Sequence, residues 1–313
     1  MNHPRIPTLA VIGSIVADIV VQTPRLPASG ENMHVPRIEA FTGGKAANAA
    51  VAFTRLGGRA HLFGQVGEDA FGRMALETLQ NEGVNAEGVA VDAQTPTGAG
   101  VLLVEANGQT AFIIAAGANL TLTVETFEPR FRALLPHLDG LLFNFEAPEA
   151  VLLTAKRLAN ERGVPVFVDA GPHRPYSADL WRGAAILTPN RSEAESMVGH
   201  AIRDDADALA AARALLAQGP RAVVLKLDAR GALLVTPDMT EFVPAFPVRL
   251  VDSAGAGDAF GAGLALAALQ GKSLIEAVRF ANACGAIAAS RFGPMPSMPT
   301  MADVMCVLGS TEG

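Results

Sequence analysis

Buried strands that alternate with helices are the feature that most limits what this chain can fold into. Six short runs rich in Val, Ile, Leu and Phe are typical of buried strands: residues 9–15, 60–66, 140–145, 164–169, 184–188 and 222–227. Most of them are separated by segments with helical character: residues 46–56, 69–82, 149–162, 191–198 and 205–218. Such alternation indicates βαβ units and a mainly parallel sheet. Ser273 and Glu276 add the pattern of a capping box, which predicts a long helix that ends near Ser290.

Two regions interrupt the alternation and predict a second, smaller sheet. Residues 16–21 and 33–41 are extended in character, with polar interruptions. Residues 97–104 and 110–115 flank a segment that contains Asn107-Gly108, and Asn-Gly is a strong signal for a hairpin turn. A small sheet of these segments, beside the ligand crevice of the main sheet, would act as a lid.

Composition and charge narrow the classes of function. Half of the 313 residues are apolar, the net charge is −7, and the Lys and Arg residues are scattered. Duplex nucleic acid is bound by concentrated positive charge, so we exclude a nucleic-acid partner. The two cysteines, Cys284 and Cys306, lack metal-ligand spacing and fit a reducing compartment. Because the chain shows neither a signal-peptide pattern nor an apolar run of bilayer length, we expect a soluble, cytoplasmic protein.

The segment Asp252-Ser-Ala-Gly-Ala-Gly-Asp258 has the composition of an anion-binding turn. We expect a strand that ends near Val251 before it, and an apolar helix over residues 259–269 after it. Gly255 and Gly257 leave room for a ligand to approach the backbone. Unpaired N–H groups and the dipole at the start of a helix suit a phosphoryl group.

Asp258 is the residue of this segment that needs a chemical explanation, because a carboxylate repels phosphate. As a general base it would take the proton of an acceptor hydroxyl that attacks phosphorus. Alternatively, it is only a helix-start residue favoured by the dipole. A further alternative is a dinucleotide fingerprint formed by Gly255, Gly257 and Gly261. That pattern is weak here, because such a fingerprint usually follows the first strand of a domain, and the position about 20 residues later lies inside an Ala-rich helical segment.

A second glycine turn, Gly43-Gly44-Lys45-Ala-Ala-Asn48, lies near the start of the chain. It is not a Walker A loop, because Ala rather than Ser or Thr follows Lys45. Its backbone N–H groups, the Lys45 ammonium and the Asn48 carboxamide could bind a polyol. The alternative is a tight turn with a surface Lys and an Asn at the start of a helix.

In this order and spacing, the two glycine turns resemble the two signatures of the ribokinase-like (PfkB) carbohydrate kinase family. Other motifs similar to those of the family lie at residues 13–18, 67–72, 144–148 and 188–193, and the resemblance spans about residues 8–308. It implies a three-layer αβα ribokinase-like fold, with a mainly parallel central sheet and a small β-sheet lid. The whole chain, residues 1–313, would be one kinase domain, with the lid formed by about residues 16–42 and 96–117.

The resemblance also implies roles for individual residues. Asp258 would be the base, and the backbone of Ala254, Gly255, Ala256 and Gly257 would form the anion hole. The hydroxyls of the acceptor would be bound by Asp18, Gly44, Lys45, Asn48 and Glu146. ATP and its Mg²⁺ would lie beside Asn190, Glu193, Lys226, Asp228, Gly231 and Asn282. A monovalent cation such as K⁺ would be held, mostly through carbonyls, by Asp252, Ala254, Ala288, Arg291, Gly293 and Ser297.

Several of these residues have a simpler structural interpretation. Asn190 and Glu193 have the spacing of a capping box. Lys226 could be a solubilising residue on an edge strand. Asn282 could be a polar residue on the exposed side of its helix.

The expected reaction is transfer of the γ-phosphoryl group of MgATP to a hydroxyl of a free sugar, by a homodimer. Ribokinases have an Asn two residues before the sugar-binding Asp, whereas this chain has Val16, which argues against ribose. A nucleoside kinase of the same fold is the alternative, since Val16, Phe112 and Ile114 could favour a base. A dinucleotide-binding oxidoreductase is disfavoured by the position of the glycine motif. A non-catalytic binding protein is disfavoured because Asp258 and both glycine turns are intact.

Overall fold

A nine-stranded sheet forms the centre of the described part of the chain. The computed structural model describes residues 5–105 and 110–309. The strands lie in the order β13-β12-β11-β10-β9-β8-β1-β4-β5. Their bounds are β1 Thr8–Ile12, β4 Arg59–Gly67, β5 Asn85–Asp92, β8 Gly140–Asn144, β9 Val166–Asp169, β10 Ile186–Thr188, β11 Val223–Lys226, β12 Gly231–Val235 and β13 Thr240–Pro244. All pairs from β5 to β11 are parallel, and β12 and β13 add an antiparallel edge.

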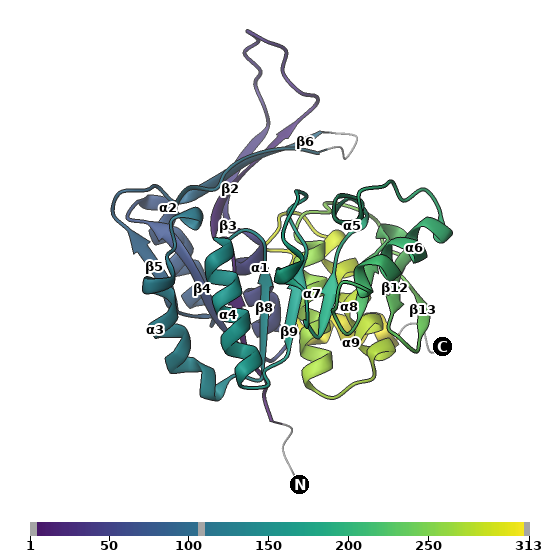
Figure 1. The fold of residues 1–313 in the computed structure, drawn as a ribbon. Coiled ribbons are helices and arrows are strands. Elements are labelled where there is room, and N and C mark those ends of the chain that lie inside the picture. The colour runs from purple at the N-terminus through teal and green to yellow at the C-terminus, as the bar shows by residue number, and fades with distance from the viewer. Residues whose placement is uncertain (1–4, 106–109, 310–313) are drawn as a thin grey trace.

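Helices cover both faces of this sheet and make three layers (Figure 1). Their bounds are α1 Lys45–Arg55, α2 Ala70–Asn81, α3 Val124–Leu134, α4 Glu149–Glu161, α5 Arg191–Val198, α6 Asp205–Leu216, α7 Ala256–Leu269, α8 Leu274–Ala289 and α9 Met301–Gly309. Successive side chains of a strand point to opposite faces, so Val11 packs in the core with α1, α7 and α8, whereas Ile12 packs with α3, α4 and α6. Apart from the strand expected to end near Val251, the expected strands and helices are present within a few residues, and so is the α8 capping box.

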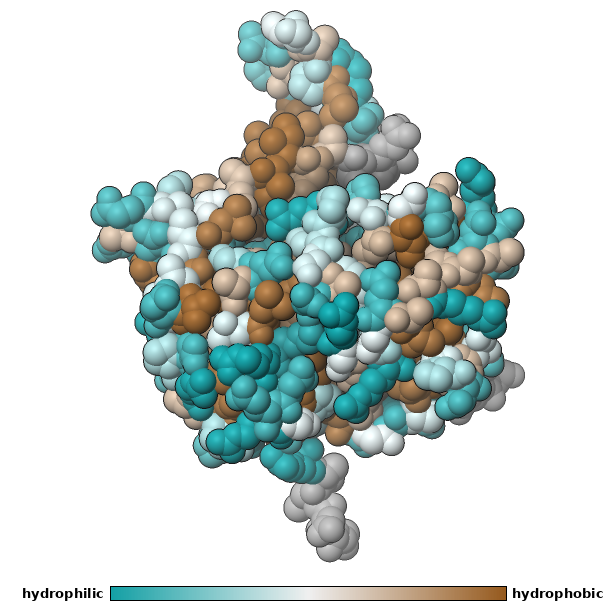
Figure 2. Space-filling view, in the orientation of Figure 1, coloured by the Kyte–Doolittle hydropathy of each residue, from teal (hydrophilic) through white to brown (hydrophobic). Residues whose placement is uncertain are grey.

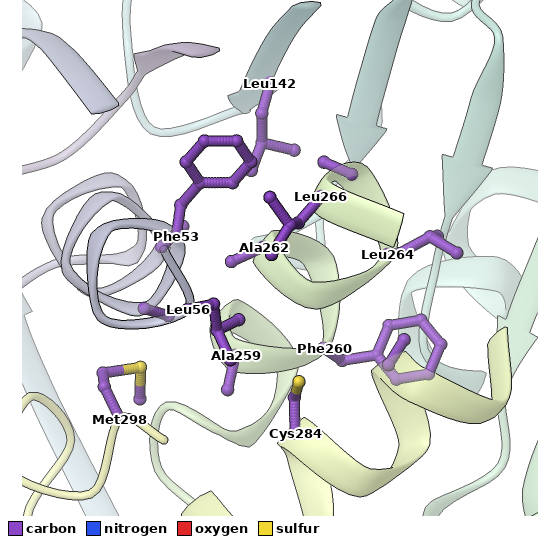
Figure 3. Packing of buried hydrophobic residues seen from close by; sticks show 14 of the residues in the cluster. Phe53, Leu56, Leu142, Ala259, Phe260, Ala262, Leu264, Leu266, Cys284 and Met298 are labelled. Carbon is purple, nitrogen blue, oxygen red and sulfur yellow. The ribbon is translucent and has the colours of Figure 1, made fainter. Parts of the chain in front are cut away.

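Helix α7 is buried between α1 and α8 over most of its length. Figure 3 shows Phe53 and Leu56 of α1 on one side of α7 and Cys284 of α8 on the other. The helices approach closely because α7 carries small residues: a Cβ added to Gly263 would lie 2.6 Å from Sγ of Cys284. Burial raises the pKa of the Cys284 thiol above its usual range, so this cysteine packs as a small apolar residue. The packing fixes the position of the N-terminus of α7.

A second, four-stranded sheet stands away from the main body, in the order β3-β2-β6-β7 (Figure 1). Its strands are β2 Val16–Thr23, β3 Arg37–Gly43, β6 Gly98–Glu105 and β7 Thr110–Ala115. Strands β2 and β6 are parallel, and the other two pairs are antiparallel. The small sheet predicted from the sequence is therefore present, while the expected Asn107-Gly108 turn lies outside the described residues. Within the described ranges, no helix has the length and apolar character needed to cross a membrane.

The strand expected to end near Val251 is absent, and that prediction was wrong. Strand β13 ends at Pro244, and the chain then has no regular structure until α7. The N–H groups of Val251 and Asp252 donate to the carbonyl of Ala289, at 2.9 and 3.2 Å, rather than to a neighbouring strand. Helix α7 starts at Ala256, three residues earlier than expected, which places Asp258 in its first turn.

Candidate active site

The N-terminus of α7 is the segment that the sequence predicts to bind an anion. Its cap residue, Gly255, has a φ of 80°, in the left-handed region that favours glycine. A Cβ at Gly255 would also lie 2.8 Å from the Met298 side chain. The first N–H groups of a helix have no acceptor within it. Of the N–H groups predicted to form the anion hole, that of Ala256 donates to the Ser253 carbonyl at 3.3 Å and that of Ala254 to Oδ1 of Asp252 at 2.9 Å. The anion hole beside Asp258 stays a prediction.

Asp258 is buried and lies among groups from several parts of the chain. Its Oδ2 accepts a hydrogen bond of 2.8 Å from Nδ2 of Asn48, and its Oδ1 lies 3.7 Å from Nζ of Lys45. Burial is the main cause that raises its pKa to about 6, with Asp169 and Glu146 adding to the rise and Lys45 opposing it. A carboxyl group with that pKa can be ionised near neutral pH and still accept a proton, as a general base must.

The second glycine turn is shaped by the residues that it contacts. A Cβ at Gly43 would lie 1.8 Å from Oδ2 of Asp18, so only glycine leaves room for this carboxylate. Gly44 has a φ of 97°, and its Cβ would lie 2.5 Å from the Ser14 carbonyl oxygen. The Lys45 N–H donates to Oγ of Ser14 at 3.0 Å. The turn thus brings Asp18, Lys45 and Asn48 to the same side as Asp258.

Glu146 reaches this region from the end of β8. The Ser14 hydroxyl donates to Oε2 of Glu146, which links the glycine turn to the β8 strand. The N–H of Glu146 donates to Oδ1 of Asn144 at 3.0 Å. Ser14 has no predicted role, although Gly13-Ser14 directly follows a buried strand, where ligand sites in parallel sheets gather.

Asp18 and Asn48 each carry a buried oxygen that has no hydrogen-bond partner in the described part of the chain. These atoms are Oδ1 of Asp18 and Oδ1 of Asn48. Buried polar atoms are nearly always paired, so two such acceptors beside one carboxylate fit a ligand with hydroxyl groups. Burial first, and then the nearby charges of Asp258, Glu146 and Asp252, raise the pKa of Asp18 to about 7.

Asn190 and Glu193 form the capping box of α5, as their spacing predicts. Oδ1 of Asn190 accepts from the Glu193 N–H at 2.8 Å, and Oε2 of Glu193 accepts from the Asn190 N–H at 2.8 Å. Glu193 is buried, and a Cβ at Gly171 would lie 2.6 Å from its Oε1 and 2.8 Å from Nζ of Lys45. The capping role does not separate Glu193 from the site, because its free carboxylate oxygen lies near Lys45.

The remaining residues expected on the nucleotide side lie on or beside β11 and α8. Lys226 is not on an edge strand: β11 lies between β10 and β12, and Nζ donates to Oδ1 of Asp169 at 2.7 Å. Asp228 has a φ of 53° in the turn that leads to Gly231. Asn282 is buried rather than on an exposed side, and its amide donates to the carbonyls of Val243 and Pro244 at 3.0 and 3.1 Å.

The residues expected to hold a monovalent cation gather where the end of α8 meets the loop before α7. Asp252 accepts from the N–H groups of Ala254 and Gly293, at 2.9 and 3.1 Å. The Ser297 hydroxyl is buried and donates to the Pro294 carbonyl, and the Ser297 N–H donates to the Gly293 carbonyl. Ala288 and Arg291 stand at the C-terminal end of α8, where the helix dipole favours a cation.

Asp169 is a site residue that the sequence interpretation missed. It lies at the end of β9, buried, with Lys226 on one carboxylate oxygen and Lys45 3.6 Å from the other. One small pocket is lined by Asp169, Lys45, Asn144, Gly257 and Asp258, together with apolar residues. An Asp at the carboxyl end of a buried parallel strand was the available signal.

A buried carboxylate at a helix start, beside two unpaired acceptors, suits the transfer of a phosphoryl group to a hydroxyl. Comparison with known proteins gives the family. Residues 7–301 match the pfkB family carbohydrate kinase profile. Ribokinases from Haemophilus influenzae and Mus musculus are 31% and 32% identical, over 95% and 96% of this chain and 97% and 94% of theirs.

Solved structures agree with this assignment. The structure of Arabidopsis thaliana ribokinase complexed with ribose and ATP has a TM-score of 0.89 and 30% identity, covering 97% of this chain and 99% of that one. The Thermotoga maritima ribokinase has a TM-score of 0.86 and 29% identity, covering 97% and 100%. The chain belongs to the pfkB family of carbohydrate kinases. It has the ribokinase-like fold and is a phosphotransferase that acts on a sugar hydroxyl.

Proposed function

We propose that this sugar kinase transfers the γ-phosphoryl group of ATP to a primary hydroxyl of a free sugar, with Asp258 as general base. The observation that carries the proposal is the position of Asp258 in the first turn of α7. Its carboxylate accepts from Asn48, a residue of the polyol-binding turn, and lies beside the helix start that would hold the phosphoryl group. A base there can take the proton of the acceptor hydroxyl while the hydroxyl oxygen attacks the phosphorus held at the helix start.

The acceptor site consists of Asp18, Gly44, Lys45, Asn48 and Glu146. The unpaired Oδ1 atoms of Asp18 and Asn48 would accept from sugar hydroxyls, and the glycine turn would donate its N–H groups. Val16 supplies no polar group where ribokinases have an Asn, so ribose lacks one partner here. A Cβ at Gly100 would lie 2.6 Å from the Phe112 ring and 3.3 Å from Asp18. Phe112 therefore adjoins the sugar site and would contact one face of the acceptor.

ATP would bind along the carboxyl ends of β10 and β11. The relative from Arabidopsis thaliana that was solved with ATP supports ATP as the phosphoryl donor. Lys226 would meet the phosphates, while Asp228, Gly231 and Asn282 would line the nucleoside side. The described residues contain no cluster of three or more metal-binding side chains. Asn190 and Glu193 would hold Mg²⁺ through water, and the ion would partly neutralise the charge of the phosphates.

A monovalent cation, K⁺ in the first instance, would bind between Asp252 and the end of α8. Its ligands would be backbone carbonyls of Ala254, Ala288, Arg291 and Gly293, with Asp252 and Ser297 beside them. Hard oxygen donors and the negative end of a helix suit such a cation. Arg291 contributes its carbonyl only, because its guanidinium pairs with Asp303 at 2.7 Å.

The small sheet, about residues 16–42 and 96–117, would serve as a lid and as the contact of a homodimer. Its β2 strand carries Asp18 into the site, whereas the opposite face of the sheet is apolar. On that face Ile38 and Ile113 are 62% and 69% exposed, and Figure 2 shows apolar residues gathered where the sheet leaves the body. We infer that a second copy of this sheet covers the apolar face, because an isologous contact would cover the apolar faces of both copies at once. We expect the protein to act in the cytoplasm, where ATP is available.

Replacement of Asp258 by Asn tests the proposal. The variant should lose at least about 1,000-fold in kcat, because the general base is gone, while the fold and the affinity for ATP stay nearly unchanged. The measurement is ADP release with pentoses, hexoses, deoxysugars, sugar acids and nucleosides, with and without K⁺. Turnover near that of the natural protein in Asp258→Asn would remove Asp258 from the role of base.

A further inference from the structure

Asp169 divides its carboxylate between two lysines from different elements. Its Oδ1 accepts from Nζ of Lys226 on β11 at 2.7 Å, and its Oδ2 lies 3.6 Å from Nζ of Lys45 on α1. Both lysines hold the pKa of the buried Asp169 carboxyl below its usual value, against the effect of burial. One carboxylate at the end of β9 thus keeps two ammonium groups in fixed positions.

The two lysines also face the proposed centre of reaction. Nζ of Lys45 lies 3.7 Å from Oδ1 of Asp258. A Cβ added to Gly257 would lie 3.5 Å from Nζ of Lys226, which places this ammonium at the start of α7. Lys45 and Asp169 line the small pocket beside Asp258, whereas Lys226 reaches the start of α7 at Gly257. Asp169 pairs with both ammonium groups and so lies between them.

We propose that Asp169 is a positioning residue that holds Lys45 and Lys226 as a pair of cations around the phosphoryl group during its transfer. This inference rests on the proposed function. A transferring phosphoryl group spreads negative charge over its equatorial oxygens, and the protein stabilises it mainly by fixed positive groups. Lysines have flexible stems and repel each other, so a shared carboxylate is needed to fix two of them at one place.

Asp169 has a second effect, on the base. Lys45 lies almost equally far from Asp169 and Asp258, at 3.6 and 3.7 Å. Without Asp169, Lys45 would pair fully with Asp258 and make it a weaker base. A role in stability alone does not account for the arrangement, because a buried ion pair adds little net stability. Both lysine side chains also keep some exposure, 27% for Lys45 and 12% for Lys226, so a ligand can reach them.

Asp169→Asn tests the positioning role, because it keeps the shape and removes the charge. We expect kcat to fall by about tenfold or more, while KM for the sugar and for ATP changes by less than about threefold, since the loss falls on the transition state. The matched control is Asp179→Asn. It breaks an exposed ion pair with Arg182 and should leave kcat unchanged. A kcat of Asp169→Asn within about twofold of the natural protein would overturn the inference.

The pH profile gives a readout that a structural defect would not produce. The groups that act on the Asp258 carboxyl are Lys45, Asp169, Asn48 and Glu146, together with the nearby carboxyl of Asp18. In Asp169→Asn, Lys45 is left to Asp258, so the acid limb of kcat/KM should move to lower pH, by about one unit. In Lys226→Met, Asp169 draws Lys45 toward itself, so the limb should move to higher pH. Shifts of the same sign, or no shift, would contradict the shared-carboxylate arrangement.

These experiments distinguish a failure of the proposed function from a failure of the role of Asp169. If Asp169→Asn shows no cooperative thermal transition, the direction of the shift in Lys226→Met decides, and an unmoved limb overturns the inference. If the natural protein releases no ADP with any acceptor, or if Asp258→Asn stays active, the proposed function itself fails. If the natural protein is active, Asp258→Asn is inactive and Asp169→Asn behaves like the natural protein, only the role of Asp169 fails.

Discussion

The buried carboxyl of Asp18 should make the natural protein less stable as pH rises, and Asp18→Asn should remove this effect. The pKa of Asp18 is about 7 in the folded chain, against 3.8 for an ordinary Asp, and burial is the main cause. Between these values the folded state keeps a proton that the unfolded state releases. The free energy of unfolding therefore falls as pH rises through this window and is level again above pH 7.

The magnitude follows from the width of that window. The gap between 3.8 and about 7, at about 1.36 kcal/mol for each pH unit, gives an upper value of about 4 kcal/mol. Asn has nearly the same shape and does not titrate. Relative to the natural protein, Asp18→Asn should therefore gain up to about 4 kcal/mol between pH 4 and pH 8. The variant should also lose affinity for the sugar, because it loses a charged acceptor of hydroxyl hydrogen bonds.

Urea denaturation of both proteins at several pH values measures the difference, provided that the m values agree. Asp303→Asn serves as a control of opposite sign. A hydrogen bond from Arg291 lowers the pKa of the Asp303 carboxyl, so its stabilising effect is present at neutral pH and is lost as pH falls. A difference between Asp18→Asn and the natural protein that stays constant within about 1 kcal/mol from pH 4 to pH 8 would refute the reasoning.

Two further substitutions test the neighbours of these carboxylates. Gly43→Ala places a Cβ 1.8 Å from Oδ2 of Asp18, so we expect the carboxylate to move and KM for the sugar to rise by about tenfold or more, with little change in KM for ATP. An unchanged sugar KM, measured by ADP release, would show that Asp18 is not in the acceptor site. Asn48→Ala removes the 2.8 Å hydrogen bond to Asp258, so the acid limb of kcat/KM should move to higher pH by about one unit. A limb that stays near pH 6 would contradict the environment described for this base.

Much of the fold could be predicted because the spacing of apolar residues within short stretches of sequence differs between strands and helices. The buried strands β1, β4, β8, β9, β10 and β11 and most of the helices were found within a few residues, whereas α3 was not predicted. Strands β5 and β13 were not predicted, because they form the two edges of the sheet and carry exposed positions that weaken the pattern. Strand β12 was also not predicted, although it is buried along its whole length. The strand expected near Val251 was predicted wrongly from its apolar residues. That segment is apolar, yet it has no neighbouring strand to pair with.

The sequence alone determined the two glycine turns and the carboxylate of Asp258 in its helix-start motif. Glycine at those positions is a local requirement: Gly44 and Gly255 adopt backbone angles that other residues avoid. The family resemblance predicted the residues on the substrate side. The structure brings Asp18, Lys45, Asn48 and Glu146 around Asp258. Those residues come from distant parts of the chain, so no local pattern could show that they meet.

Only the tertiary structure determined which charged groups lie around Asp258. Asp169 and Lys226 lie 57 residues apart in sequence and become partners because β9, β10 and β11 end at the same edge of the sheet. The raised pKa values of Asp18 and Asp258 arise from burial, which exists only after folding. The sequence thus specified most of the groups that we propose for the chemistry, and the folded chain set how strongly each one holds a proton.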